Sequence, residues 1–157
     1  MTVDEKLKLR AQNLGLDYID RFRKIEFSQL QEGIYDYPEA AFNLLSDMEK
    51  CYASRAYYAA ICLAYSAIEI YLVQVEKLKP NRKEGNVLKQ AGLGKNYEWL
   101  IKIRNAIVHG NQHELIQYGG WDDKGLEFVL DGMCQKAFKL AHSLPFAMRK
   151  DRRELQN

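Results

Sequence analysis

The stretch AYYAAICLAYSAIEIYLV, residues 56–73, decides how the rest of the chain must be arranged. Only a serine and Glu69 within it are neither apolar nor aromatic, so the segment approaches the length of a membrane span. Its alanines and tyrosines, its internal carboxylate and the adjacent Arg55 suit a helix buried among other helices better. We therefore expect the central helix of a bundle here, continuing to about Leu78 before Pro80 stops it, and no contact with a membrane.

Towards the N-terminus, hydrophobic spacing predicts two further helices. Residues 3–25 carry apolar side chains at steps of three or four, which predicts an amphipathic helix with Gly15 as the place for a bend. The residues of this stripe are Val3, Leu7, Leu14, Tyr18, Phe22 and Ile25. After a connector that contains Gly33, Pro38 fits as the first residue of a second helix that runs to about Cys51. The expected inner face of that helix is Ala41, Leu45 and Met48.

Towards the C-terminus, the patterns indicate two more helices and leave one alternative open. Residues 82–95 are basic and contain glycine, which indicates a short helix or a loop, and a helix of about four turns follows over 97–109. Residues 126–144 have helical spacing. The alternative is a β-hairpin in which 114–121 and 126–130 pair across an Asp-Asp-Lys-Gly turn. We favour the helix.

Together these patterns predict an all-α fold, a single-domain bundle of about five helices. Residues 1–157 are taken as one domain with its core over about 38–144, a last helix that ends near Pro145, and a frayed tail over 149–157. The composition, 47% hydrophobic and 28% charged, is that of an ordinary globular domain. The formal net charge of +2 permits contact with nucleic acid but does not by itself argue for it.

Cysteine and histidine usage points away from disulfides and metals. Cys51, Cys62 and Cys134 are an odd number without metal-binding spacing, which indicates free thiols in a cytoplasmic protein. The N-terminal residues lack the apolar core of a signal peptide, which agrees with a cytoplasmic location. His113 and His142 show no pairing typical of a metal site, so neither a metal nor another cofactor is expected.

The most distinctive chemical feature is the hexapeptide RNAIVH, residues 104–109, which is followed directly by Gly110. Arg104 can hold a phosphate with a planar fork of donors, and His109 is the side chain whose ordinary pKa lies nearest neutrality. Such a pair suits the handling of phosphodiesters. With Asn96 as the N-cap and Gly110 as a left-handed residue after the last turn, the motif closes its helix.

A helical wheel assigns different surroundings to the motif side chains. Arg104 falls in the middle of the apolar face, where a charge must be paired, bound to a ligand or placed at a subunit seam. Asn105 and His109 are four residues apart and share a polar edge. Because Arg104 and His109 diverge by about 140° on one helix, Arg104 of one subunit is expected to work with His109 of another in a symmetric dimer.

Two features of residues 56–73 bear on the motif. Glu69 is a carboxylate within an apolar helix, and we expect it to support the site by pairing with Arg104 or with the polar edge of the motif. The alternatives are a partner such as Arg55, or simple solvent access where the helix emerges. The tyrosines of this helix are expected in core or interface packing rather than in base stacking, and they are Tyr57, Tyr58, Tyr65 and Tyr71.

With the motif at the end of a helix, behind YYAA at 57–60 and AIE at 67–69, the chain resembles the HEPN superfamily of small helical bundles. The resemblance covers roughly residues 38–144 and rests on the family's signature of Arg, four to six residues and His, with a polar residue after the arginine, here Asn105. It implies homodimers that bring two motifs together. It also implies metal-independent endoribonuclease activity in toxin–antitoxin, phage-defence or RNA-processing systems, with RNA as substrate and a cognate antitoxin or another protein as partner.

The reaction implied is attack of the RNA 2′-hydroxyl on the adjacent phosphate. His109 would exchange a proton with the 2′-oxygen or the leaving 5′-oxygen, Arg104 would stabilise the phosphorane-like transition state, and Asn105 would orient the imidazole or donate to a phosphate oxygen. Asn111 departs from the family's toxins, which commonly have a tyrosine two residues after the histidine, and this puts membership of that class in doubt. The alternative function is a non-catalytic HEPN module that binds a nucleotide, a nucleic acid or a protein.

Overall fold

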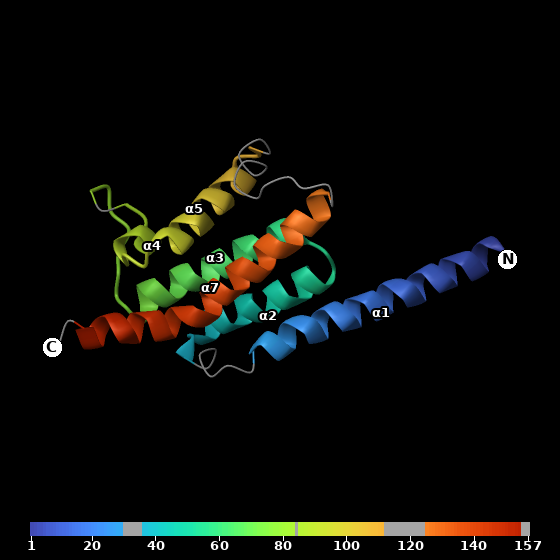
Figure 1. The fold of residues 1–157 in the computed structure, drawn as a ribbon, viewed down its shortest axis with the longest axis horizontal. Helices are drawn as coiled ribbons and strands as arrows, with labels where there is room; N and C mark the ends of the chain where they lie inside the picture. The colour runs from blue at the N-terminus through green and yellow to red at the C-terminus, as the bar shows by residue number, and fades with distance from the viewer. Residues whose placement is uncertain (30–35, 84, 112–124, 155–157) are drawn as a thin grey trace.

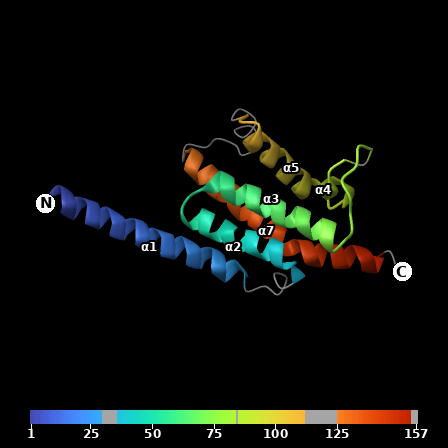
Figure 2. The ribbon, with the colours of Figure 1, turned by 180° about the vertical axis from the view of Figure 1, so that it is seen from behind.

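The computed structural model describes residues 1–29, 36–83, 85–111 and 125–154, and it shows an all-α, single-domain helical bundle (Figures 1 and 2). The described helices are α1 (Val3–Gln29), α2 (Glu39–Ala53), α3 (Tyr57–Gln74), α4 (Val87–Gln90), α5 (Lys95–Val108) and α7 (Leu126–Glu154). The predicted number of about five helices matches the five long ones, since α4 is a single turn. Within these residues the only β-type pairing is an isolated bridge between Asn81 and Gly85.

Helix α3 is the centre of the bundle, as the sequence predicts. It contacts α2, α4, α5 and α7, and both views show it lying between these elements (Figures 1 and 2). By length and composition alone α3 could cross a membrane, yet half of its residues are buried within the bundle. Its buried residues span about 160° of a wheel of roughly 100° per residue, and the opposite side of the helix is half-buried or exposed. The buried residues are Tyr57, Ala60, Ile61, Ala64, Tyr65, Ala67, Ile68, Tyr71 and Leu72.

Both ends of α3 are set by residues with positive φ. Arg55, with φ of 63°, turns the chain between α2 and α3. At the other end α3 stops at Gln74, one turn earlier than the predicted Leu78. Lys77 has φ of 59°, and the Leu78 amide donates to the Leu72 carbonyl over 3.0 Å, so the helix is closed before Pro80 is reached.

Helix α2 follows the prediction closely, whereas α1 only partly does. The predicted inner face of α2 is buried, with Pro38 at the N-cap position rather than inside the helix. Helix α1 is continuous through Gly15 and extends to Gln29. Its N-terminal half lies outside the bundle, where Val3 is 73% exposed and Leu16 is 61% exposed (Figure 1). Of the predicted stripe, Val3 is exposed and Tyr18 is half-buried, and the other four side chains lie outside the described ones.

Helix α7 corrects two predictions about the C-terminal region. Residues 126–130 are helical, so the hairpin alternative is wrong for its second arm, while 114–121 lies outside the described residues. The helix also continues through Pro145 to Glu154, so Pro145 does not end it and residues 149–154 are not a frayed tail. Hydroxyl groups of Tyr37 and Tyr97 donate to carbonyls in the turn before Pro145, which keeps that turn hydrogen-bonded despite the missing amide.

Candidate functional site

Helix α5 carries the motif and begins earlier than predicted. The N-cap is Gly94, with φ of 92°, and the predicted cap Asn96 lies inside the first turn with its side chain exposed. The Gly94 carbonyl accepts from the amides of Tyr97 and Glu98. Glycine fits this position because a positive φ is strained for other residues. An N-cap prediction based on side-chain chemistry misses such a start.

The buried face of α5 is rotated from the predicted one. Its fully buried residues are Tyr97, Leu100, Ile103 and Ala106. On a wheel of roughly 100° per residue, Arg104 lies about 70° from the centre of this stripe, not at its middle. Arg104 therefore lies at the edge of the buried stripe and is half-buried. Next to the core stripe lies what we call the motif face, which is half-buried or exposed and consists of Ile101, Arg104, Asn105, Val108 and His109.

Arg104 is held by an aromatic ring and an amide. Its Cζ lies 5.0 Å from the centroid of the Tyr65 ring on α3, and its Nη1 donates to Asn105 Oδ1 over 3.0 Å. Among the described residues no carboxylate lies within ion-pairing distance of Arg104. The remaining guanidinium donors therefore have no protein partner in this part of the chain. Of the three surroundings predicted for Arg104, the ion pair is absent from the described residues, and the half-buried position leaves the free donors open to solvent, a ligand or a second subunit.

Tyr65 is in turn fixed from its other end. Its ring is 2% exposed, and its hydroxyl accepts a hydrogen bond from Asn86 Nδ2. Asn86 is the N-cap of α4, where its Oδ1 accepts from the Leu88 amide over 2.7 Å. Burial raises the pKa of Tyr65, the Asn86 hydrogen bond and Arg104 oppose that rise, and Glu69 adds to it. Tyr65 and Asn86 are site residues that the sequence reasoning missed.

Glu69 and Arg104 both interact electrostatically with Tyr65, but the two charged groups do not pair with each other. Glu69 is half-buried on α3, one turn after Tyr65. No ion pair or hydrogen bond connects it to Arg104, Asn105 or His109 in the described part of the chain, and the alternative partner Arg55 pairs with Asp17 and Glu127 instead. The structure thus places Glu69 near Tyr65 and shows no direct contact between its carboxylate and the motif side chains.

His109 ends α5 with its side chain exposed. It is the C-cap, and its amide donates to the Asn105 carbonyl over 2.9 Å. Gly110 follows with φ of 68°, as predicted, and donates to the Ile107 carbonyl, while the Asn111 amide donates to the Ala106 carbonyl over 2.9 Å. This pair of bonds is a Schellman motif, which fixes the chain direction directly after the histidine. The imidazole is therefore carried on an ordered helix end and is open to solvent.

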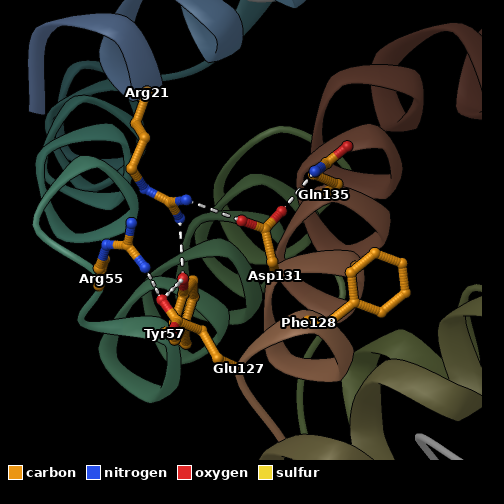
Figure 3. Close-up of a pocket in the computed structure, with 8 residues that line it drawn as sticks. Arg21, Arg55, Tyr57, Glu127, Phe128, Asp131 and Gln135 are labelled. Atoms are coloured by element: carbon orange, nitrogen blue, oxygen red, sulfur yellow. Dashed lines mark hydrogen bonds and ion pairs between the residues drawn. The ribbon is translucent and has the colours of Figure 1, made fainter. Parts of the chain in front are cut away.

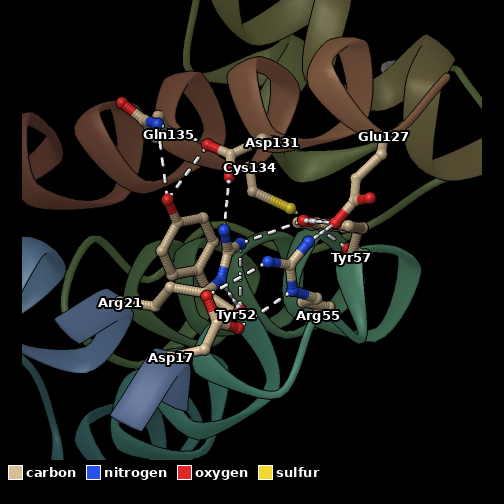
Figure 4. Close-up of polar contacts among 9 residues, drawn as sticks. All are labelled: Asp17, Arg21, Tyr52, Arg55, Tyr57, Glu127, Asp131, Cys134 and Gln135. Carbon is tan, nitrogen blue, oxygen red and sulfur yellow. Dashed lines mark hydrogen bonds and ion pairs between the residues drawn. The ribbon is translucent and has the colours of Figure 1, made fainter. Parts of the chain in front are cut away.

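A second polar cluster lies where α1 crosses the end of α2 and the starts of α3 and α7 (Figures 3 and 4). A pocket of about 530 Å³ opens here. It is lined by Arg21, Arg55, Tyr57, Glu127, Phe128, Asp131, Gly132 and Gln135. The spacing of Glu127, Asp131 and Gln135, one turn apart on α7, is a sequence signal that could have indicated a polar stripe here.

The charged groups of this cluster satisfy one another. Arg21 Nη1 lies 2.9 Å from Asp131 Oδ2, and its other donors reach the Tyr52 carbonyl and the Tyr57 hydroxyl. Arg55 pairs with Asp17 over 3.0 Å and also with Glu127. Burial works against ionisation of Asp131, but hydrogen bonds from Gln135, Tyr52 and Arg21 together lower its pKa. Burial and the hydrogen bond to Asp131 raise the pKa of Tyr52 to about 12.

The two clusters thus differ in what they offer to a ligand. The arginines of the pocket are already bound to carboxylates, which suits a structural tie between helices. Arg104 has free donors, and the exposed His109 follows at the end of the same helix. In the described residues no group of three or more His, Cys, Asp or Glu side chains is arranged to hold a metal ion. Comparison of the chain with protein-family models, with curated proteins and with solved structures finds no match.

Proposed function

We propose that this protein is a metal-independent endoribonuclease of the HEPN type, which acts in the cytoplasm as a homodimer with its site on the motif face. The observation that carries the proposal is the state of Arg104, a half-buried guanidinium with unpaired donors, five residues before the exposed His109 at the end of the same helix. A phosphodiester supplies the negative charge and the acceptor oxygens that this guanidinium lacks within the described chain.

The proposed roles of the three residues are those implied by the resemblance to HEPN proteins. His109 exchanges a proton with the 2′-oxygen or the leaving 5′-oxygen, because its imidazole is exposed at the end of α5. Arg104 donates to the non-bridging oxygens as negative charge develops on them. Asn105 accepts from Arg104 through Oδ1, so its amide group is left to donate to a phosphate oxygen rather than to hold the imidazole. Cleavage leaves a 2′,3′-cyclic phosphate and a 5′-hydroxyl.

The exposed part of the motif face supports a dimer. Val108 is 55% exposed beside Arg104, and Ile101 is half-buried one turn before it. Apolar side chains around a charged group are typical of an interface that becomes buried in an assembly. A two-fold axis through this face would bring Arg104 of one subunit towards His109 of the other, which resolves the divergence of the two side chains on a single helix.

The first test is cleavage of mixed RNAs by purified protein in EDTA. We expect cleavage in the wild type, and a loss of about 10²- to 10⁴-fold in His109→Ala, the usual worth of a general acid or base. The matched control is Glu98→Ala, which removes another exposed side chain of α5 and should leave the rate unchanged. Equal cleavage by wild type and His109→Ala would assign the activity to a contaminant and would contradict the proposal.

The dimeric arrangement has its own test. Arg104→Ala and His109→Ala subunits, mixed so that heterodimers form, regain one intact composite site if the two residues act across the seam. We expect up to about half of the dimers in an equimolar mixture to be active by random pairing. Activity no greater than that of either homodimer would show that the two residues do not act in trans.

The alternative proposal is a non-catalytic module that uses the same face to bind a nucleotide, a nucleic acid or a protein such as an antitoxin. The free donors of Arg104 favour anion binding whether or not chemistry follows. Binding of RNA that is lost in Arg104→Ala, without any cleavage that depends on His109, would select this alternative.

A further inference from the structure

Two arginines of the described structure, Arg104 and Arg21, are partly buried, and they differ in the contacts that their guanidinium groups make. Arg21 is fixed by Asp131, by the Tyr52 carbonyl and by the Tyr57 hydroxyl. Arg104 has one hydrogen bond, to Asn105, and lies over the Tyr65 ring. A ring face attracts the cation without using its N–H donors. A guanidinium that lies over a ring therefore keeps its N–H donors available to bind an anion.

The ring itself is held by a chain of contacts that reaches α4. The hydroxyl of Tyr65 accepts from Asn86, and Asn86 is at the same time the cap of α4 through its bond with the Leu88 amide. Both Val87 and Leu88 are buried in the core, so Asn86 cannot shift without moving α4. Tyr65 is therefore fixed at its hydroxyl end by α4, while its own helix α3 fixes its backbone.

We propose that Tyr65 is a positioning residue for Arg104, which holds the guanidinium plane against α3 so that its free edge meets a phosphate on the motif face. The inference rests on the proposed function, because the phosphate is the scissile group of that reaction. Tyr65 does not touch the substrate. It acts through Arg104, so removing it should affect the step in which the guanidinium is needed most, the development of charge on the phosphate.

The test compares a variant that keeps the ring with one that removes it. Tyr65→Phe keeps the ring face, and Tyr65→Leu keeps an apolar side chain without it. The matched control is Tyr71→Leu, which removes an equally buried tyrosine of the same helix that stacks on Tyr37 instead of lying under Arg104. For Tyr65→Leu we expect kcat to fall by about 2- to 30-fold, the range for a partly desolvated cation–π contact, with little change in KM. Tyr65→Phe should recover most of the loss, and Tyr71→Leu should not reproduce it at a temperature where all the variants are folded.

A double-mutant cycle separates positioning from a general loss of structure. In an Arg104→Ala background Tyr65→Leu should cause no further fall in kcat, because the group it positions is gone. An equal fall with and without Arg104, or the same fall in Tyr71→Leu, would overturn the inference while the ribonuclease proposal stands.

A binding experiment covers the case in which the protein does not cleave RNA. The probe is a 2′-deoxy oligonucleotide, which presents phosphates but no attacking hydroxyl, and the readout is its affinity by fluorescence anisotropy across the same cycle of Tyr65→Leu and Arg104→Ala. Affinity losses that are not additive, with coupling of about 2-fold or more, support the positioning role even if cleavage is absent. In a protein that shows no cleavage, additive losses, or no binding by the wild type, overturn it.

Discussion

The hydroxyl of Tyr37 donates a hydrogen bond of 2.5 Å to the carbonyl oxygen of Ala141, the residue four positions before Pro145 in α7. In an uninterrupted helix that carbonyl would accept from the amide of residue 145, which proline lacks. Tyr97 supplies a second hydroxyl to the neighbouring carbonyl of Leu140 over 2.9 Å. Both tyrosines are buried, so the open carbonyls are satisfied by side chains from other parts of the bundle rather than by water.

Replacing Tyr37 by phenylalanine should therefore destabilise the protein. The Ala141 carbonyl would remain buried without a donor, which costs about 1–3 kcal/mol. Urea denaturation measures the loss. In a Pro145→Ala background the new amide can bond this carbonyl, so Tyr37→Phe should cost less there. Equal costs in the two backgrounds would mean that the tyrosine does not compensate for the proline.

The burial of His142 predicts that the protein loses stability in acid. Substitution of this one residue separates its contribution from those of the other titrating groups. His142 is 6% exposed, its ring lies 4.3 Å from that of Phe138, and neither ring nitrogen has a hydrogen-bond partner in the described structure. Burial lowers its pKa from 6.5 to about 4. The unfolded chain thus binds more protons than the folded one in this window, so stability falls as the pH is lowered from 6.5 towards 4, by up to about 3 kcal/mol.

The measurement for His142 is the free energy of unfolding at several pH values between 7 and 4. His142→Leu removes the titrating group and two unsatisfied nitrogens while keeping an apolar side chain of similar bulk. We expect the variant to be as stable as the wild type or more stable at pH 7, and to lose less stability towards pH 4. Parallel profiles would show that His142 is not the source of the acid sensitivity.

Cys134 should be unreactive in the folded protein. Its thiol is 3% exposed and donates to the Tyr57 carbonyl, and burial strongly raises its pKa. The reactive thiolate is thus scarce and shielded. In a Cys51→Ala/Cys62→Ala protein, which keeps only this thiol, alkylation in buffer should be slower than in denaturant by about a hundred-fold or more, since it requires opening of the core. Labelling at nearly equal rates would place Cys134 on an accessible surface.

Gly110, which follows the C-cap of α5, and Gly132, inside α7, should respond to alanine with opposite sign. Gly110 has φ of 68° after the motif histidine, and a Cβ there would meet no atom within 4 Å, so only backbone strain opposes substitution. Gly110→Ala should cost about 1–2 kcal/mol of stability. Gly132 lies inside α7 with equally open space, and Gly132→Ala should stabilise by about 0.5–1 kcal/mol. If Gly110→Ala were also stabilising in thermal denaturation, the left-handed closure of α5 would be wrong.

How far the sequence predicts this structure depends on how local each determinant is. The central position of α3 and the inner face of α2 follow from residues within one segment, and both were predicted correctly. The continuation of α7 past Pro145 depends on Tyr37, 104 residues away from its partner Ala141, and no local pattern contains that information. For the same reason the local pattern predicts that the helix ends at the proline.

In the candidate site, too, local features can be read from the sequence, whereas contacts between helices cannot. The spacing of Arg104, Asn105 and His109 and the left-handed Gly110 are visible in the sequence. The ring under Arg104 comes from another helix, and the wheel of α5 alone could not show that Ala106 belongs to the buried stripe. A small residue contributes little to an apolar pattern, yet it decides which face packs closely, and here it moves Arg104 from the centre of the buried face to its edge.

The last prediction concerns what attaches α1, whose N-terminal half lies outside the bundle. Arg21 and Asp131 form an ion pair whose side chains are 13% and 17% exposed, so Arg21→Met should lower stability by about 1.5–3 kcal/mol and speed amide hydrogen exchange along α1. Asp17→Asn, which weakens the more exposed pair with Arg55, should have a smaller effect.

The ion pair also has a pH dependence of its own. Because the pKa of Asp131 is lowered in the folded protein, the stability that its carboxylate contributes is fully present above pH 3.8. It is lost as the pH falls through the lower pKa of the folded state. The pH dependence of the unfolding free energy should therefore differ between Arg21→Met and the wild type below pH 3.8. A difference confined to pH 6.5 to 4 would contradict this assignment, because His142 titrates in that range.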